Sequence, residues 1–82
     1  MAVLKLELEL EREAGSGRWI ADIVSLPGVM VYGATKAEAI RKAQALAFEV
    51  IGDRLAHGED LLTGQPRKVQ RPLAGVQFAT AG

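Results

Sequence analysis

The sequence predicts an α+β domain: an antiparallel three-stranded sheet with one long helix on one face, followed by a weakly patterned C-terminal strand. Two observations favour this fold class. Over residues 3–12 leucines alternate with charged residues, and a period of two is typical of a strand with one buried face. Further along, Thr35 and Glu38 have the spacing of a capping box at the start of a stretch rich in helix-forming residues. We therefore expect three strands, one helix and one further strand, in that order.

The first two strands are predicted to form a hairpin. In residues 3–12 the leucines would face the core, while Lys5 and the glutamates would face solvent. Residues 13–17 contain two glycines, which indicates a hairpin loop. The second strand follows over residues 18–24 and has two different faces. Trp19, Ala21 and Ile23 lie on one face, and Ile20, Asp22 and Val24 lie on the other.

The segment before the helix joins it to the hairpin. Pro27 and Gly28 break the second strand and reverse the chain, so that a short third strand over residues 29–32 pairs beside it. Gly33 lets the chain leave the sheet, and Thr35 begins a helix that folds back over the sheet.

The helix is predicted from Lys36 to about His57, with Gly58 as its C-terminal stop. One face of it carries the residues expected in the core. These are Ala39, Ile40, Ala43, Leu46, Ala47 and Val50. A second apolar stripe lies beside this face, and together the two are wider than one sheet face usually covers. The second stripe consists of Phe48, Ile51 and Leu55.

The chain of 82 residues is long enough for one domain. Its core is expected over residues 3–58, followed by a linker over 59–72 and a tail strand over 73–80. Glycine and proline residues keep the linker irregular, apart from a short edge strand that could form near Val69.

Composition and charge exclude several classes of function. Hydrophobic residues make up 49% of the chain and charged residues 24%, which is typical of a globular protein. The 10 basic and 10 acidic residues give zero net charge, so we expect no direct DNA binding. No apolar run reaches the ~18 residues needed to cross a membrane, and the N-terminus has no signal-peptide core. We therefore expect a cytoplasmic protein with no cofactor and, because it lacks cysteine, no disulfide.

Several short motifs occur together in this chain. They are Trp19, Ala21, Leu26-Pro27-Gly28, Gly33, Thr35 and Glu38-Ala39. In their joint spacing, over residues 4–64, the sequence resembles the HicB-like antitoxin family of small bacterial domains. The resemblance implies a reduced ribonuclease-H-like fold with the element order β-β-β-α-β. It also implies a partner, a small RNA-cleaving toxin of double-stranded-RNA-binding fold whose active site the antitoxin masks.

The sequence departs from the family pattern in two ways. It has Val24 and Ser25 where the family often has a proline and an acidic residue. Many members also carry a C-terminal DNA-binding module, for which we expect no room in a chain that ends soon after residue 80. Binding of a toxin is thus the expected function, and an orphan homo-oligomeric domain without a toxin is the alternative.

Catalysis is not expected. The only histidine, His57, falls at the predicted C-terminus of the helix, where the helix dipole favours a cation, so we interpret it as structural. A metal-dependent nuclease is the enzymatic alternative, because ribonuclease-H-like folds place carboxylates on the first strand, the helix and the fourth strand. Glutamates occur on the predicted first strand and on the predicted helix, but the tail strand has no acidic residue. We therefore predict neither a metal site nor a catalytic residue.

The sheet face turned away from the helix is the predicted partner surface. On this face an acidic strip of the first strand lies beside an apolar patch, a combination that suits a binding interface. The candidate residues are Glu7, Glu9, Glu11, Ile20, Met30 and Tyr32, with Val24 beside them. The alternative interpretation, scattered surface hydrophobes, has equal weight on the sequence alone.

A homo-oligomer, either a dimer or a tetramer, is predicted because a chain this short has a thin core and no disulfide or metal to reinforce it. The second apolar stripe of the helix and the tail strand are the expected subunit contacts. These contacts are Phe48, Ile51, Leu55, Val76 and Phe78. In the alternative, the tail covers the helix of its own chain.

Overall fold

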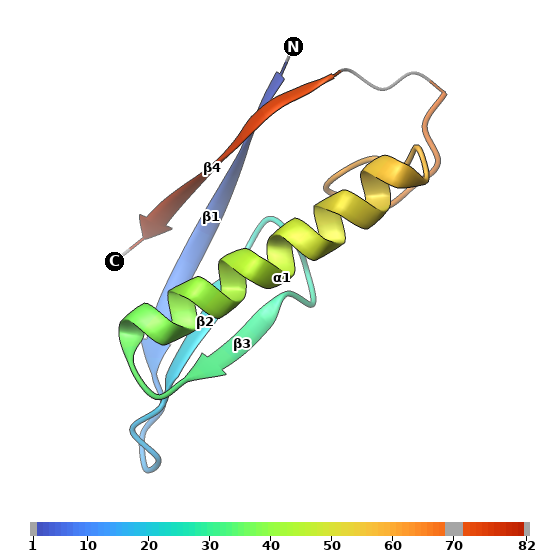
Figure 1. Cartoon of the computed structure of the whole chain (residues 1–82). Helices are drawn as coiled ribbons and strands as arrows, with labels where there is room; N and C mark the ends of the chain where they lie inside the picture. Colours follow the sequence, from blue (N-terminus) through green and yellow to red (C-terminus); the bar gives the residue numbers. More distant parts are fainter. Residues whose placement is uncertain (1, 69–71, 82) are drawn as a thin grey trace.

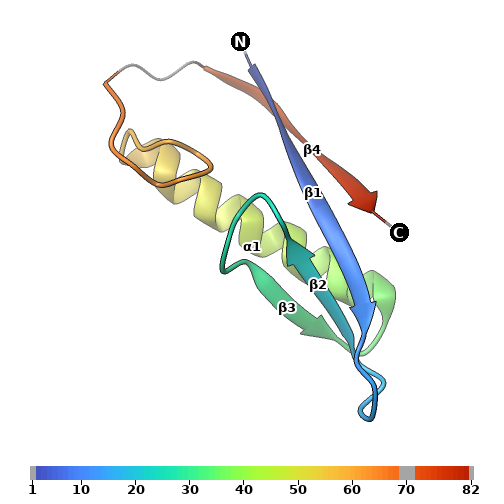
Figure 2. The same ribbon diagram turned by 180° about the vertical axis from the view of Figure 1, so that it is seen from behind.

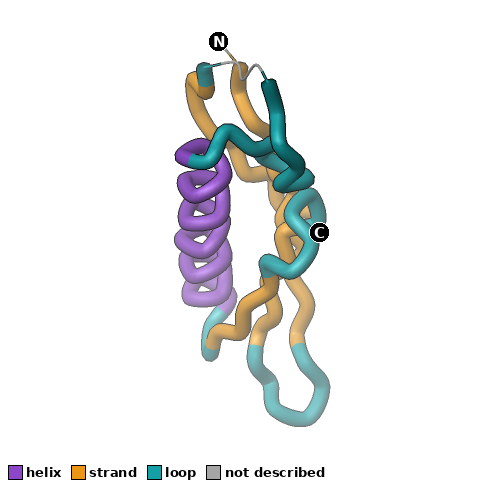
Figure 3. Tube along the Cα trace, turned by 90° about the vertical axis from the view of Figure 1, so that its right-hand side faces the viewer, coloured by secondary structure: helices purple, strands orange, loops and turns teal. Residues whose placement is uncertain are grey.

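The computed structural model describes residues 2–68 and 72–81. Its elements are β1 (Ala2–Arg12), β2 (Trp19–Ile23), β3 (Met30–Gly33), α1 (Lys36–Ala56) and β4 (Leu73–Ala81) (Figure 1). The strands form one layer and α1 forms a second layer against one face of it (Figure 3). The predicted edge strand near Val69 lies outside the described residues.

The four strands form a single mixed sheet in the order β3-β2-β1-β4. β2 pairs antiparallel with both β1 and β3, whereas β4 pairs parallel with β1. The prediction of an α+β domain with one long helix is therefore confirmed, and the prediction of a three-stranded antiparallel sheet is wrong. The physical reason is the connection through α1, which is long enough to return the chain to the end of the sheet where β1 begins.

The core lies between α1 and the sheet. As predicted, the alternation in β1 turns its leucines toward α1, and Leu6 and Leu8 are fully buried. The turn after β2 adds Leu26 and Val29 to the same cluster. From α1, the buried residues are Ala39, Ala43, Ala47 and Ile51. Three of these four are alanines, so the helix backbone approaches the sheet closely.

Ile51 corrects the predicted division of the helix into two stripes. It is only 2% exposed and belongs to the core, not to the second apolar stripe. The buried positions recur every four residues along α1, and such a row is inclined to the helix axis. The buried face therefore turns gradually around the helix and includes Ile51 near the C-terminal end.

Both ends of α1 are capped as the sequence predicts. The Thr35 hydroxyl accepts a hydrogen bond of 3.1 Å from the Glu38 amide. At the other end Gly58 has a φ of +66°, and its amide and that of Glu59 donate to carbonyls of the last turn at 3.2 and 2.9 Å. This is a Schellman motif, which ends the helix at Ala56, one residue before the expected position.

The segment after α1 is held to the helix by side-chain contacts. Arg54 donates a hydrogen bond of 2.8 Å to the carbonyl of Leu61. The amides of Thr63 and Leu62 donate to the Asp60 carboxylate, which holds the pKa of Asp60 below its ordinary value. The first part of the predicted linker is thus an ordered loop, although it is not a strand.

A candidate partner surface on the outer face of the sheet

The outer face of the sheet, turned away from α1, is not covered by any other described helix or strand (Figure 2). Strand register places two rows of side chains across it. In the first row Glu11 lies opposite Ile20, which lies opposite Tyr32. In the second row Glu9 lies opposite Asp22, which lies opposite Met30. With Glu7, the residues of these two rows form what we name the acidic–apolar patch.

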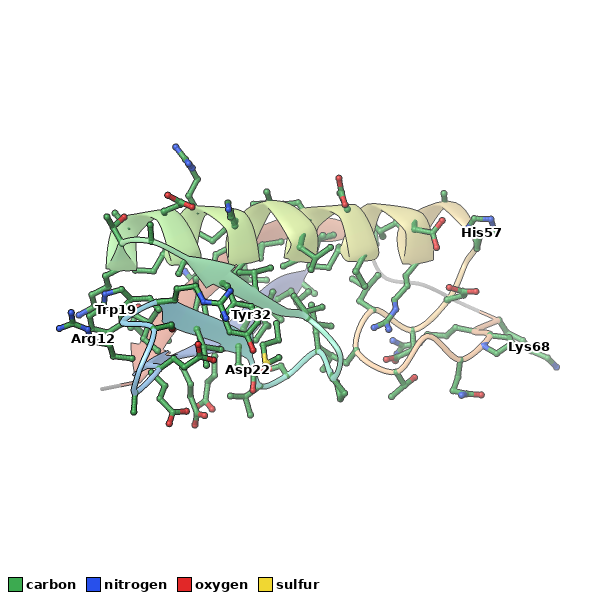
Figure 4. All side chains as sticks on the ribbon, turned by 90° about the horizontal axis from the view of Figure 1, so that it is seen from below. Arg12, Trp19, Asp22, Tyr32, His57 and Lys68 are labelled. Carbon is green, nitrogen blue, oxygen red and sulfur yellow. The ribbon has the colours of Figure 1, made fainter. Side chains whose placement is uncertain are left out.

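The apolar end of the patch is open to solvent. Met30 is 50% exposed and Tyr32 is 38% exposed, and both stand on β3. The guanidinium of Arg18 lies over the Tyr32 ring, 4.4 Å from its centre, in a cation–π contact. Figure 4 shows Tyr32 and Asp22 on the far side of the sheet from α1. Large apolar side chains in this setting favour a contact surface for another molecule.

The acidic end of the patch has uncompensated negative charge. Among the described residues, none of the carboxylates of Glu7, Glu9 and Glu11 forms an ion pair, and neither does that of Asp22. Two of these negative charges face each other, because Glu9 lies directly opposite Asp22 in the antiparallel pair of β1 and β2. Like charges at such positions lower the stability of the sheet.

Chemically, the patch combines a negative field with an apolar contact area. A shallow depression between the two rows is lined by Glu9, Leu10, Glu11, Ile20, Asp22 and Met30. Its carboxylates can accept hydrogen bonds from lysine and arginine side chains, and its apolar wall can pack against the stems of those side chains. This suits a protein partner with a basic surface.

The structure places every residue predicted for the partner surface on the outer face, and the strand register adds Asp22 to them. Asp22 belongs to the patch, although the sequence prediction left it out of the list. The alternation of residues 18–24 had already put Asp22 on the same face as Ile20, and this was the signal that could have identified it. Val24 is 44% exposed but follows the last residue of β2 and is absent from both rows.

Of the residues predicted as subunit contacts, one is buried in the core and the other four are partly or largely exposed. Ile51 is in the core, as described above. Phe48 and Phe78 contact each other within one chain, edge to face, with ring centres 5.7 Å apart. Val76 and Leu55 are half-buried on the same side of the sheet. The tail thus packs partly on its own helix, yet Phe48 remains 53% exposed.

The geometry does not favour the nuclease alternative. The glutamates of β1 point to the outer face, whereas Glu38 and Glu49 are on α1, beyond the opposite face. Glu38 forms an ion pair of 2.9 Å with Lys42, and the hydrogen bond from Lys42 lowers the pKa of Glu38. Within residues 2–68 and 72–81, no group of three or more histidines, cysteines, aspartates or glutamates could hold a metal ion.

His57 is an exposed residue at the C-terminus of α1. Its Nδ1 lies 2.7 Å from the Asp53 carbonyl oxygen and 3.4 Å from a carboxylate oxygen of the same residue. The hydrogen bond to that carbonyl raises the pKa of His57, and the negative charge of Asp53 adds to the effect. These contacts fit the structural interpretation of the histidine.

The comparisons with family models, with curated proteins and with solved structures gave no match. Separately, α1 is not apolar enough to cross a membrane, and the described residues contain no other helix.

Proposed function

We propose that this chain is a non-catalytic protein-binding module that uses the acidic–apolar patch to bind a small basic protein. The observation that carries the proposal is the pair of cross-strand rows, each with carboxylate at one end and an exposed apolar side chain at the other. Such a surface attracts a cationic partner over a distance and then holds it by apolar contact.

The resemblance to HicB-like antitoxins supports a more specific partner, a small RNA-cleaving toxin in the cytoplasm. A protein that cleaves RNA carries basic residues near its active site, because it must bind phosphates. An acidic surface of this chain would cover those residues and so mask the site. The description of the fold as a reduced ribonuclease-H-like sheet is part of the same proposal.

An orphan homo-oligomer is the second candidate function. It would use the exposed side chain of Phe48 and the tail strand β4 rather than the acidic–apolar patch. The two candidates therefore use different faces of the molecule, and variants on one face distinguish them.

The proposal predicts a short basic protein encoded beside this gene, and co-expression of the two proteins tests it. We expect the two proteins to co-purify and this chain to relieve the growth arrest that the basic protein causes alone. The double variant Glu9→Lys/Glu11→Lys should lose both effects while remaining folded. The matched control Glu49→Lys changes an exposed charge on α1 and should keep both.

Two outcomes would contradict the proposal. One is an adjacent gene that encodes no short basic protein. The other is a complex that forms equally well with the Glu9→Lys/Glu11→Lys variant, because binding would then use another surface.

A further inference from the structure

We propose that the outer edge of β4 pairs antiparallel with β4 of a second copy, which joins two sheets of four strands into one continuous sheet. β4 is the last strand in the order β3-β2-β1-β4, so among the described residues no strand lies on its other side. It is nine residues long, and its sequence LAGVQFATA contains neither a charged residue nor a proline. Charged residues and prolines on an edge strand are the features with which proteins usually prevent edge pairing, and β4 has neither.

The other edge of the sheet is different. β3 has only four residues, and a short edge strand offers few backbone groups to a partner. Arg18 also lies over the Tyr32 ring on that side. The long, uncharged edge at β4 is therefore the edge that offers more unpaired backbone groups to another strand.

The sequence of β4 is compatible with symmetric self-pairing. Its regular pairing with β1 runs from Gly75 to Ala81, after an irregularity near Ala2. An antiparallel pair that overlaps all seven of these residues has its two-fold axis at Phe78. Each Phe78 then faces the partner's Phe78, and Gln77 faces the partner's Ala79.

This register also keeps the two faces of the sheet consistent. Val76 and Phe78 are on the side of α1 in each copy, and Gln77 and Ala79 are on the outer side. The two-fold axis is perpendicular to the sheet, so both helices lie on the same side. Phe48, which already contacts Phe78 edge to face, would then border a larger aromatic cluster built from both copies.

The overall dimensions support a missing partner. The chain exposes 5383 Å², whereas a compact monomer of this mass is expected to expose about 4,800 Å². Its radius of gyration is 13.8 Å, compared with about 12 Å for a compact domain of this length. The chain is therefore more extended than a compact monomer of this length, which leaves both edges of its sheet accessible.

A second copy is a better occupant of this edge than the basic protein proposed above. The outer side of β4 presents Gln77 and Ala79, which have no charge to attract a cationic partner and none to repel an identical strand. Pairing at β4 also leaves the acidic–apolar patch on β1, β2 and β3 accessible in both copies. The inference is thus independent of the proposed function.

Sedimentation of the full chain between about 1 and 100 μM tests the proposal, and we expect a dimer at the upper concentrations. The double variant Gln77→Lys/Ala79→Lys places like charges directly opposite each other across the two-fold axis, and should weaken the dimer at least tenfold. The matched control Gln77→Glu/Ala79→Lys places opposite charges at the same positions and should keep the dimer.

Disulfide trapping tests the register without relying on stability. The chain has no cysteine, so the double variant Gln77→Cys/Ala79→Cys should form disulfide-linked dimers on mild oxidation. The control Lys5→Cys/Glu7→Cys changes the neighbouring positions on β1 and should stay monomeric under denaturing conditions. A wild-type chain that sediments as a monomer at 100 μM would overturn the proposal. So would a dimer that survives Gln77→Lys/Ala79→Lys and does not become crosslinked.

Discussion

Replacing Gly33 with alanine is expected to push the start of α1 away from the sheet. Gly33 is the last residue of β3 and is buried beneath the first turn of the helix. A Cβ atom at this position would lie 2.5 Å from the backbone nitrogen of Ala39 and 2.8 Å from its Cα. Because carbon atoms in contact are normally about 3.5–4.0 Å apart, the helix backbone must move by roughly 1 Å.

The loss of stability in Gly33→Ala depends on which atoms must move to make room for the added methyl group. The two atoms nearest to the new methyl group are backbone atoms of Ala39 and the third is its Cβ, so no flexible side chain can relieve the contact. Overpacking of a well-packed core typically destabilises a protein by about 1–3 kcal/mol. For a domain of this length, a loss of about 2 kcal/mol lowers Tm by roughly 8–16 °C.

Thermal unfolding followed by circular dichroism measures this change at a fixed protein concentration. Gly52→Ala is the matched control, because Gly52 lies within α1 and an added Cβ meets nothing within 4 Å. This control should raise stability by about 0.5–1 kcal/mol, since alanine favours the helix. A Gly33→Ala variant with the Tm of the wild type would refute the close approach of α1 to β3.

Two further predictions concern charged residues. Glu9→Gln removes the like-charge pair with Asp22 and should stabilise the isolated chain by about 0.2–1 kcal/mol in urea unfolding, while weakening the binding of a basic partner. For His57, whose folded-state pKa is raised above the ordinary 6.5, the added stability is present below the unfolded-state pKa and lost as pH rises through the folded-state pKa. NMR titration of this single histidine should give a pKa above 6.5 in the wild type and a lower pKa in Asp53→Asn; equal values would contradict the assigned contact.

The features that the sequence predicted correctly depend on neighbours along the chain. The alternation in β1 requires only the two-residue period of a strand, and the caps at Thr35 and Gly58 require only the residues within one helical turn. Each of these could be recognised from a few consecutive residues.

The features that the sequence did not predict depend on how distant elements meet. Ile51 is buried because the row of positions four residues apart faces the sheet, and no local pattern fixes which row of the helix does so. The parallel pairing of β4 with β1 depends on the return of the chain through α1, and nothing within the uncharged segment LAGVQFATA specifies its neighbour.

The candidate site was predicted only in part, because the rest of it also depends on how distant strands pair. Alternation alone assigned the glutamates of β1 and the apolar residues of β2 and β3 to one face. The two rows, and with them the direct opposition of Glu9 and Asp22, became visible only with the strand register. The proposed binding role rests in part on that opposition, because like charges at facing positions lower stability.

The central claim, that the outer sheet face binds a small basic protein, is tested most directly by NMR mapping of the complex. The ¹⁵N-labelled chain is titrated with the unlabelled short basic protein that the proposal predicts from the adjacent gene, and the amide shifts are followed residue by residue. The account predicts the largest shifts at Glu9, Glu11, Asp22, Met30 and Tyr32, with little change at Ala45 and Glu49 on the exposed side of α1. Shifts concentrated on α1, or no shifts at a concentration of about 100 μM, would contradict it.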